Sequence, residues 1–264
     1  MPRFRFPRLA ARALLGEIRD ALASLVFPAP CRICEATLDT ASRIPICREC
    51  LESLQPISPP VCQTCGRPFV SALAGLVRQP LCQLCRRGVY AFDCARSYGI
   101  YDAAMVRAIV LLKYQAVTPL GGWFAARLAE LVERQRDSLA ADVVVPVPLH
   151  ATRLRERGYN QAELIARPLA KRLGLPFRSY LLVRTRPRPD NLKLTRRERW
   201  HTVRGAYATR EGTRVDKLRV LLVDDVFTSG ATLDACARAL RQAGAARVLG
   251  LTVARAVPNW VGPA

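Results

Sequence analysis

The spacing of apolar residues predicts a regular succession of strands and helices in the last two thirds of the chain. Short, almost continuous apolar runs indicate buried strands at residues 91–101, 141–148, 218–225 and 246–254. Apolar residues that recur every three or four positions indicate amphipathic helices at residues 103–114, 123–135, 160–172 and 232–244. Strands that alternate with helices predict an α/β fold, in which a mostly parallel sheet is flanked by helices.

Proline and glycine mark where these elements stop. Pro146 and Pro148 end the second strand, and Gly174 follows the third helix. Pro168 lies inside that helix, where its missing N–H predicts a kink or a split. Residues 184–204 show neither the period of a strand nor that of a helix, and they hold eight Lys or Arg against two acids. We therefore expect one long, flexible basic loop there.

The first 30 residues have a different pattern. An amphipathic helix is predicted from Leu9 to Val26, packed on its own protein. The Arg-rich opening also resembles a transit peptide, but Glu17 and Asp20 within the helix count against one. The apolar run at residues 22–26 is far shorter than the about 20 residues that span a bilayer. We therefore expect a cytoplasmic protein with no transmembrane segment.

Residues 31–90 carry four Cys-x-x-Cys pairs. Two residues between thiolates let one short turn offer both sulfurs to a tetrahedral ion, and a hairpin can return the next pair. We expect two structural zinc sites, formed by Cys31, Cys34, Cys47 and Cys50 and by Cys62, Cys65, Cys82 and Cys85. The grouping of consecutive pairs is an assumption, because interleaved ligation would use the same eight residues.

Two other interpretations of these cysteines stay open. A disulfide scaffold would need an oxidising compartment, and no export signal is present. An Fe–S cluster is a second alternative, because thiolates alone do not select the metal. The quartets hold no His or carboxylate that would indicate an open, catalytic zinc. Cys94 and Cys236 lie outside the quartets and are expected to be small core residues.

The composition adds one feature to this picture, which is charge. The chain has 264 residues with 41 Lys and Arg against 21 Asp and Glu, a formal net charge of +20. Such a surface attracts phosphates on nucleotides, nucleic acids or acidic membranes, although a coding bias toward Arg would have the same effect. Half of the residues are hydrophobic, which indicates a folded protein rather than a disordered tail.

The third strand ends in two acids that precede a turn of small and hydroxylated residues, VLLVDDVFTSGAT. Ligands bind at the carboxyl ends of parallel strands, where we expect Asp224 and Asp225 to lie. The turn opens the next helix, whose positive end and backbone N–H groups favour a phosphate. A ribose 5-phosphate suits both parts, since carboxylates accept from its 2′ and 3′ hydroxyls while the turn holds its phosphate. The predicted phosphate residues are Thr228, Ser229, Gly230, Ala231 and Thr232.

Other interpretations of this strand and turn are weaker. The GxGxxG and GxxxxGK[ST] loops of dinucleotide and P-loop sites are absent from the sequence. A receiver domain would need a phosphoacceptor Asp and a Lys on later strands, but only one plausible strand follows in this sequence. Simple solvation of two acids at a sheet end is the remaining alternative.

The quoted stretch resembles the phosphoribosyl pyrophosphate motif of type I phosphoribosyltransferases. The order of four Cys-x-x-Cys pairs, LLKY, VPVPLH, RGYNQA and the Asp-Asp strand resembles the ComF family of competence-associated proteins over nearly the whole chain. The resemblance implies a type I phosphoribosyltransferase-like domain at residues 91–264, a double zinc-binding region at 31–90 and the N-terminal helix at 1–30.

This resemblance implies that phosphoribosyl pyrophosphate binds with Mg²⁺, and that Asp224 and Asp225 are the catalytic residues. The pyrophosphate would need cationic and N–H donors, for which residues 150–162 supply a candidate loop and the basic segment a cover. The candidates for pyrophosphate binding are Lys113, Arg153, Arg157, Gly158 and Asn160. His150 and His201 are the two histidines of the chain, so a His general base has little support.

Two functions follow from the resemblance and the charge. The first is a phosphoribosyltransferase whose acceptor the sequence does not identify, associated with DNA uptake. The alternative is a non-catalytic competence factor that binds single-stranded DNA or proteins of the competence machinery and keeps the fold as a ligand sensor.

Overall fold

The computed structural model describes residues 30–38, 42–187 and 195–257. The chain divides into two compact units between Leu54 and Gln55. The predicted N-terminal helix at residues 9–26 lies outside the described residues. Among the described helices, none is long and apolar enough to cross a membrane.

The first unit contains the first cysteine quartet and one short helix, α2 (Arg48–Glu52). Its described apolar residues are few, and Ile33, Leu38, Ile46 and Leu54 are buried. So small an apolar set cannot by itself compensate for the entropy of ordering a chain, which is why such a segment needs a metal.

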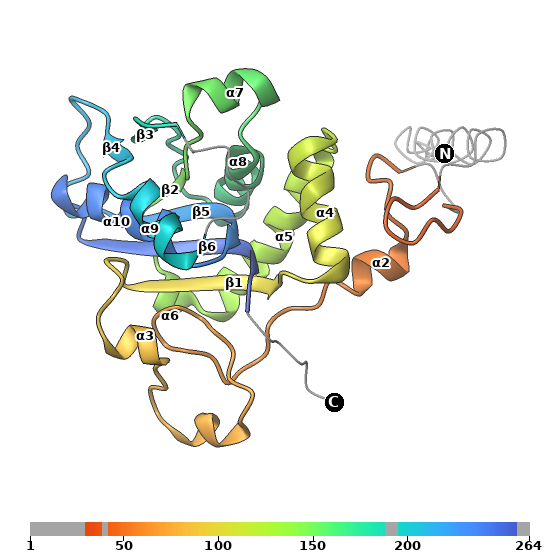
Figure 1. Cartoon of the computed structure of the whole chain (residues 1–264), viewed down its shortest axis with the longest axis horizontal. Coiled ribbons are helices and arrows are strands. Elements are labelled where there is room, and N and C mark those ends of the chain that lie inside the picture. The colour runs from red at the N-terminus through yellow and green to blue at the C-terminus, as the bar shows by residue number, and fades with distance from the viewer. Residues whose placement is uncertain (1–29, 39–41, 188–194, 258–264) are drawn as a thin grey trace, which may run out of the picture. The chain divides into compact units, whose positions relative to one another are not determined.

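The second unit contains a parallel sheet in the strand order β1-β6-β5-β2, whose strands lie one above another in Figure 1. All three strand pairings are parallel, and Asp224 of β5 lies beside Thr252 of β6. The main strands are β1 (Cys94–Ile100), β2 (Val143–Pro146), β5 (Arg219–Phe227) and β6 (Arg247–Arg255). The predicted mostly parallel α/β fold is confirmed.

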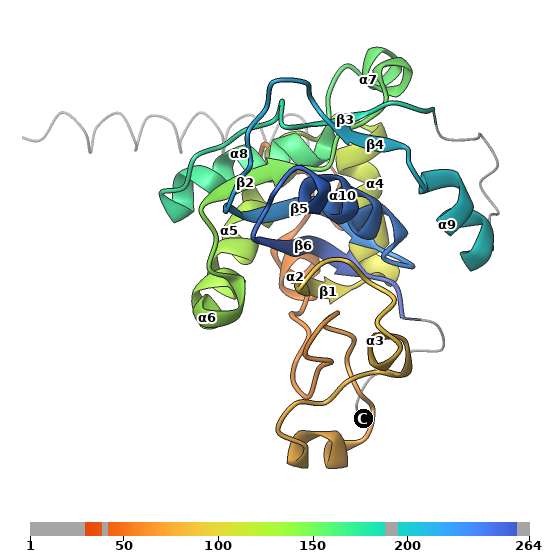
Figure 2. The ribbon, with the colours of Figure 1, turned by 90° about the vertical axis from the view of Figure 1, so that its left-hand side faces the viewer.

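Helices cover both faces of this sheet, as Figure 2 shows. One face carries α5 (Pro119–Arg134) and α8 (Gln161–Leu173), which pack on each other, with α4 (Ala103–Tyr114) beside α5. The other face carries α10 (Ala231–Gln242), which contacts β5, β6 and β4 (Tyr207–Thr209), and β4 forms a small antiparallel pair with β3 (Leu182–Arg184). The remaining elements are η1 (Ala72–Leu76), α3 (Gln83–Arg86), α6 (Arg136–Leu139), α7 (Ala151–Arg157) and α9 (Arg196–Val203).

Three local predictions were wrong. Residues 196–203 form α9 rather than loop, because Thr195 and Glu198 make a capping box that starts a helix. Residues 151–157 form α7, which His150 caps and Gly158 ends at φ 79°. The strand that carries the two acids was predicted to end at Asp225, but β5 continues to Phe227, which still pairs with Arg255 of β6.

Pro168 does not split its helix, since α8 runs continuously from Gln161 to Leu173. Proline removes the donor to the carbonyl four residues earlier, that of Leu164. Gly121 of α5 packs on this carbonyl, and a Cβ at Gly121 would lie 2.6 Å from the oxygen. The two helices therefore approach each other closely at the carbonyl that proline leaves without an intrahelical donor, and α8 is not split there.

Candidate functional site

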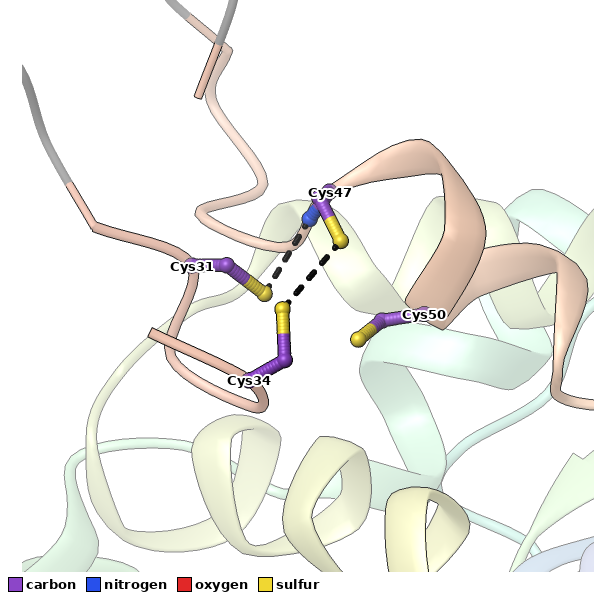
Figure 3. Close-up of side chains that lie close together, drawn as sticks. All are labelled: Cys31, Cys34, Cys47 and Cys50. Atoms are coloured by element: carbon purple, nitrogen blue, oxygen red, sulfur yellow. Dashed lines mark hydrogen bonds between the residues drawn. The ribbon is translucent and has the colours of Figure 1, made fainter. Parts of the chain in front are cut away.

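The first cysteine quartet places four sulfurs around one point (Figure 3). All four lie within 4.8 Å of one another, and the Sγ atoms of Cys34 and Cys47 are 3.5 Å apart. The Cys31 sulfur accepts hydrogen bonds from the N–H groups of Ile33 and Cys47 at 3.4 and 3.3 Å. Burial opposes ionisation of Cys31, but backbone hydrogen bonds from Cys34, Cys47 and Ile33 together lower its pKa to about 6. The thiolate form is thus favoured at Cys31, whereas the pKa values of Cys47 and Cys50 are raised.

The second quartet repeats this geometry within the second unit. The sulfurs of Cys65 and Cys82 are 3.7 Å apart, and Cys82 N–H donates to the Cys62 sulfur at 3.3 Å. Hydrogen bonds from the thiols of Cys65 and Cys85 hold the pKa of Cys62 far below its usual range. Gly66 closes the first turn at φ 69°, where a Cβ would lie 2.6 Å from the Ala95 carbonyl oxygen. Glycine is therefore required where this turn meets β1.

Both quartets fit a tetrahedral zinc ion. Zn–S bonds of about 2.3 Å put the sulfurs about 3.8 Å apart, close to the spacings found here. The structure gathers consecutive pairs, so interleaved ligation is wrong. None of the ten cysteines forms a disulfide, and the disulfide scaffold is also wrong. Four thiolates close each site and leave no position for a reacting water, which makes the zinc structural. Cys94 and Cys236 are buried core residues, as predicted.

The neighbouring acids on β5 are both buried, with exposures of 9% for Asp224 and 4% for Asp225. Successive strand residues face opposite sides of a sheet. Val220 and Leu222 pack in the core cluster formed with α10, so the alternation places Asp224 on the α10 face and Asp225 on the face of α4. The two carboxyl groups therefore reach the carboxyl edge of the sheet from different sides.

Asp225 has a direct partner, which is Lys113 of α4 at 2.7 Å between Nζ and Oδ2. Burial alone would lower the pKa of Lys113, but the charge of Asp225 and their hydrogen bond raise it above its usual value. The lysine is thus held as a cation beside the acid pair.

Asp224 has no ion pair with any residue that the structure describes, and it accepts a hydrogen bond from the Asp225 N–H at 2.9 Å. Burial and the neighbouring charge of Asp225 raise its pKa from 3.8 to about 7, although Lys113 and Arg184 act in the opposite direction. A carboxyl group that costs this much to ionise gains most from a ligand that supplies cations or hydroxyl donors.

The turn after β5 leads directly into α10. Gly230 is the N-cap of this 12-residue helix at φ 81°, and as a glycine it has no side chain to cap the helix. The Ser229 hydroxyl accepts from Ala231 N–H at 3.4 Å, while the Tyr90 hydroxyl donates to the Ser229 carbonyl at 3.0 Å. A Cβ at Gly230 would lie 2.6 Å from Phe227 and 2.7 Å from Tyr90, so the turn is packed against two rings.

The predicted cations meet at one cavity. A pocket of 230 Å³ is lined by Lys113, Arg153 and Arg157, together with Tyr114 and Tyr159. The Arg157 guanidinium lies over the Tyr114 ring at 5.0 Å. Because Lys113 also pairs with Asp225, this cavity and the acid pair share one residue.

Gly158 and Asn160 have structural roles in the structure. Gly158 ends α7 in the left-handed conformation. Asn160 caps α8, accepting from Ala162 N–H at 3.0 Å and donating to the Val147 carbonyl at 3.0 Å. His150 accepts from Thr152 N–H at the start of α7, at 3.4 Å. The segment is therefore a capped helix and turn, with its arginines on α7.

Sequence reasoning missed Tyr90 and Arg184, which no spacing singles out. Tyr90 lies in the connection between the second quartet and β1 and donates to the Ser229 carbonyl in the turn after β5. Arg184 begins the basic segment and donates to the Tyr207 hydroxyl at 3.1 Å, within reach of the charge of Asp224. The contacts that reveal both residues join positions far apart in the chain.

Comparison with known protein families agrees with this architecture. Residues 22–86 match the double zinc ribbon domain, and residues 160–257 match the phosphoribosyl transferase domain. The fold of the second unit is accordingly type I phosphoribosyltransferase-like, and the two cysteine quartets are the sites of the double zinc ribbon.

Three similar proteins have names that refer to DNA utilization or competence. The DNA utilization protein YhgH of Salmonella typhi is 30% identical over 228 residues, 85% of this chain and 96% of its own length. Competence protein ComFC of Bacillus subtilis is 27% identical over 80% of this chain and 84% of its own, and competence protein F of Haemophilus influenzae is 29% identical over 51% and 62%. With the quartets, the sheet and these relatives in agreement, the chain belongs to the ComF family.

Proposed function

We propose that the domain at residues 91–264 binds phosphoribosyl pyrophosphate with Mg²⁺ and transfers its phosphoribosyl group to an acceptor, in association with DNA uptake. The observation that carries this proposal is Lys113, which pairs with Asp225 and lines the cavity of Arg153 and Arg157. One cation thereby joins a site for a sugar diol to a site for an anion.

Each part of the site suits one part of this ligand. The start of α10 and its turn would hold the 5-phosphate through backbone N–H groups and hydroxyls. Asp224 and Asp225 would accept from the ribose hydroxyls, one from each face of the sheet edge. The three cations would bind the pyrophosphate, and their hold strengthens as negative charge develops on the leaving group.

The acid pair also fits a magnesium ion. Carboxylate oxygens are the ligands that Mg²⁺ prefers, and a cation at this position would offset the burial and the charge of Asp225 that raise the pKa of Asp224. The ion would be held by Asp224 and Asp225 together with oxygens of the ligand, and would neutralise the departing pyrophosphate.

Calorimetry with phosphoribosyl pyrophosphate and Mg²⁺ tests the proposal. We expect Asp225→Asn and Lys113→Met each to weaken binding at least about tenfold, since each removes a charged contact to the ligand or its metal. Arg136→Ala is the control, because Arg136 pairs with Glu133 on the surface. Unchanged affinity in both site variants would reject the site, and pyrophosphate release with a panel of bases would show whether transfer occurs.

A second candidate function is binding of single-stranded DNA by the zinc ribbon region. Residues 53–92 contain no Asp or Glu and four arginines, of which Arg78, Arg86 and Arg87 are exposed. A surface of one charge binds nucleic-acid phosphates and releases their counterions, so affinity should fall steeply with salt.

The salt dependence of binding to a labelled oligonucleotide tests this second candidate. We expect Arg78→Gln combined with Arg87→Gln to reduce the slope of log K against log salt by about 1.4, from about 0.7 for each lost phosphate contact. A slope that is the same in this variant and in Arg136→Ala would place DNA binding elsewhere or exclude it.

A further inference from the structure

Arg255 is a buried cation at the end of β6, with 4% of its surface exposed. Its guanidinium donates to the Cys65 carbonyl at 2.7 Å and to the Cys65 sulfur at 3.3 Å. Cys65 belongs to the second quartet, so one side chain of the sheet reaches the metal site directly.

A buried guanidinium needs a compensating anion. Among the described residues, no carboxylate lies within 4.0 Å of Arg255. A zinc ion with four thiolates carries a net charge of −2, and Cys65 supplies one of those thiolates. The second metal site is therefore the anion that Arg255 faces.

The guanidinium also contacts Phe227, which packs against the predicted phosphate turn at residues 228–232. Arg255 lies 4.0 Å from the centroid of the Phe227 ring, at the distance of a cation–π contact. Phe227 is the last residue of β5, and a Cβ at Gly230 would meet its ring at 2.6 Å. Tyr90 completes the support, because it packs edge-on against Phe227 and donates to the Ser229 carbonyl.

We propose that Arg255 couples the second zinc site to the phosphate turn, so that the metal holds residues 227–230 in the conformation that binds phosphate. Arg255 is a positioning residue in this assignment, since it touches the metal ligand and Phe227. The link to ligand affinity rests on the proposed function, whereas the link between zinc and the turn does not.

Arg255→Met tests the coupling, and Arg255→Lys keeps the charge without the fork of donors. The matched control is Arg96→Met. Arg96 is also a buried arginine of the sheet, and it donates to the carbonyl of Gln63 in the same region without a hydrogen bond to a cysteine sulfur. Three measurements on the full chain are compared: zinc release to a chelator, hydrogen exchange of the amides at residues 227–233, and affinity for phosphoribosyl pyrophosphate.

We expect Arg255→Met to speed release of one of the two zinc equivalents about 10- to 100-fold, the usual effect of losing a group that supports a metal ligand. Hydrogen exchange of the amides at residues 227–233 should become faster in the same variant. Arg255→Lys should give zinc release and exchange rates between those of Arg255→Met and the wild type. In Arg96→Met, zinc release and amide exchange should both stay nearer to the wild-type rates.

Equal zinc release and equal exchange in Arg255→Met and Arg96→Met would overturn the coupling, as would faster zinc release with an unchanged turn. The ligand measurement separates the two proposals. If the wild type binds no phosphoribosyl pyrophosphate, the proposed function fails, while zinc release and exchange still decide the role of Arg255.

Discussion

At the scale of single residues, the site is defined by charges that the fold has buried. Lys113 and Asp225 satisfy each other at 2.7 Å, and Arg255 faces a cysteine sulfur. Asp224 alone among the acids of the site is left with a pKa raised to about 7 by burial and by Asp225. Ionising a buried carboxyl group with a raised pKa lowers the stability of the folded protein. Selection for stability alone would not keep such a group, which supports a role in binding.

Asp224→Asn should stabilise the protein without ligand, and more so at high pH. The folded carboxyl binds its proton up to about pH 7 and the unfolded one to its usual value of 3.8. Between these values the folded state holds more protons, so its stability falls as pH rises through that window. We expect the variant to gain on the order of 1–4 kcal/mol at pH 8 and progressively less toward pH 5.

Thermal melts from pH 5 to 8 check this expectation. Asp225→Asn is the comparison, because it leaves Lys113 without its partner and should lower the melting temperature instead. A gain in Asp224→Asn that does not change with pH would show that ionisation of this group is not its cause.

At the scale of elements, α5 and α8 approach each other closely at the turn of α8 that precedes Pro168. Gly121 lies on the Leu164 carbonyl that proline leaves without an intrahelical donor, whereas a Cβ at the adjacent Gly122 would have no heavy atom within 4 Å. The two neighbouring glycines therefore have different roles. Gly121 permits the close approach of the two helices, whereas Gly122 only weakens the helix.

Replacing each glycine with alanine should have opposite effects. Gly121→Ala places a methyl group 2.6 Å from the Leu164 oxygen and should cost about 1–3 kcal/mol through overpacking. Gly122→Ala should stabilise by up to about 1 kcal/mol, the usual gain in a helix. Urea denaturation of the two variants measures both, and a loss of stability in each would indicate that Gly122 also has a packing role.

At the scale of the whole molecule, the two zinc sites are not equivalent. The first quartet lies in the unit that ends at Leu54. Cys62, Cys65 and Cys82 of the second quartet belong to the core cluster that also contains Phe227 and Leu233. The second metal is thus part of the phosphoribosyltransferase-like unit, although its sequence belongs to the double zinc ribbon.

Serine substitutions in the two quartets should separate these roles. Cys62→Ser should lower the melting temperature of the second unit by several degrees, at roughly 2–4 °C for each kcal/mol lost. Cys34→Ser should release the first zinc and leave that transition unchanged. Calorimetric melting with a zinc count for each variant makes the comparison, and equal shifts would show that the two units unfold together.

Sequence alone determined the parallel α/β fold, the eight metal ligands and the acid-and-turn segment at residues 220–232. Each of these depends on local spacing: the period of a strand or helix, two residues between thiolates, or a turn that opens a helix. The prediction of a loop at residues 196–203 was wrong. The capping box that starts α9 is a local signal, but the prediction gave more weight to the basic composition of the segment.

Tertiary structure decided everything that joins distant positions. The division between Leu54 and Gln55, the meeting of Lys113 with Asp225, the cover on the Leu164 carbonyl and the contact of Arg255 with Cys65 all unite segments that no periodicity relates. The physical reason is that a residue's charge and burial depend on which surfaces pack on it. That packing is a property of the folded sheet with its helices, and no short window of sequence contains it.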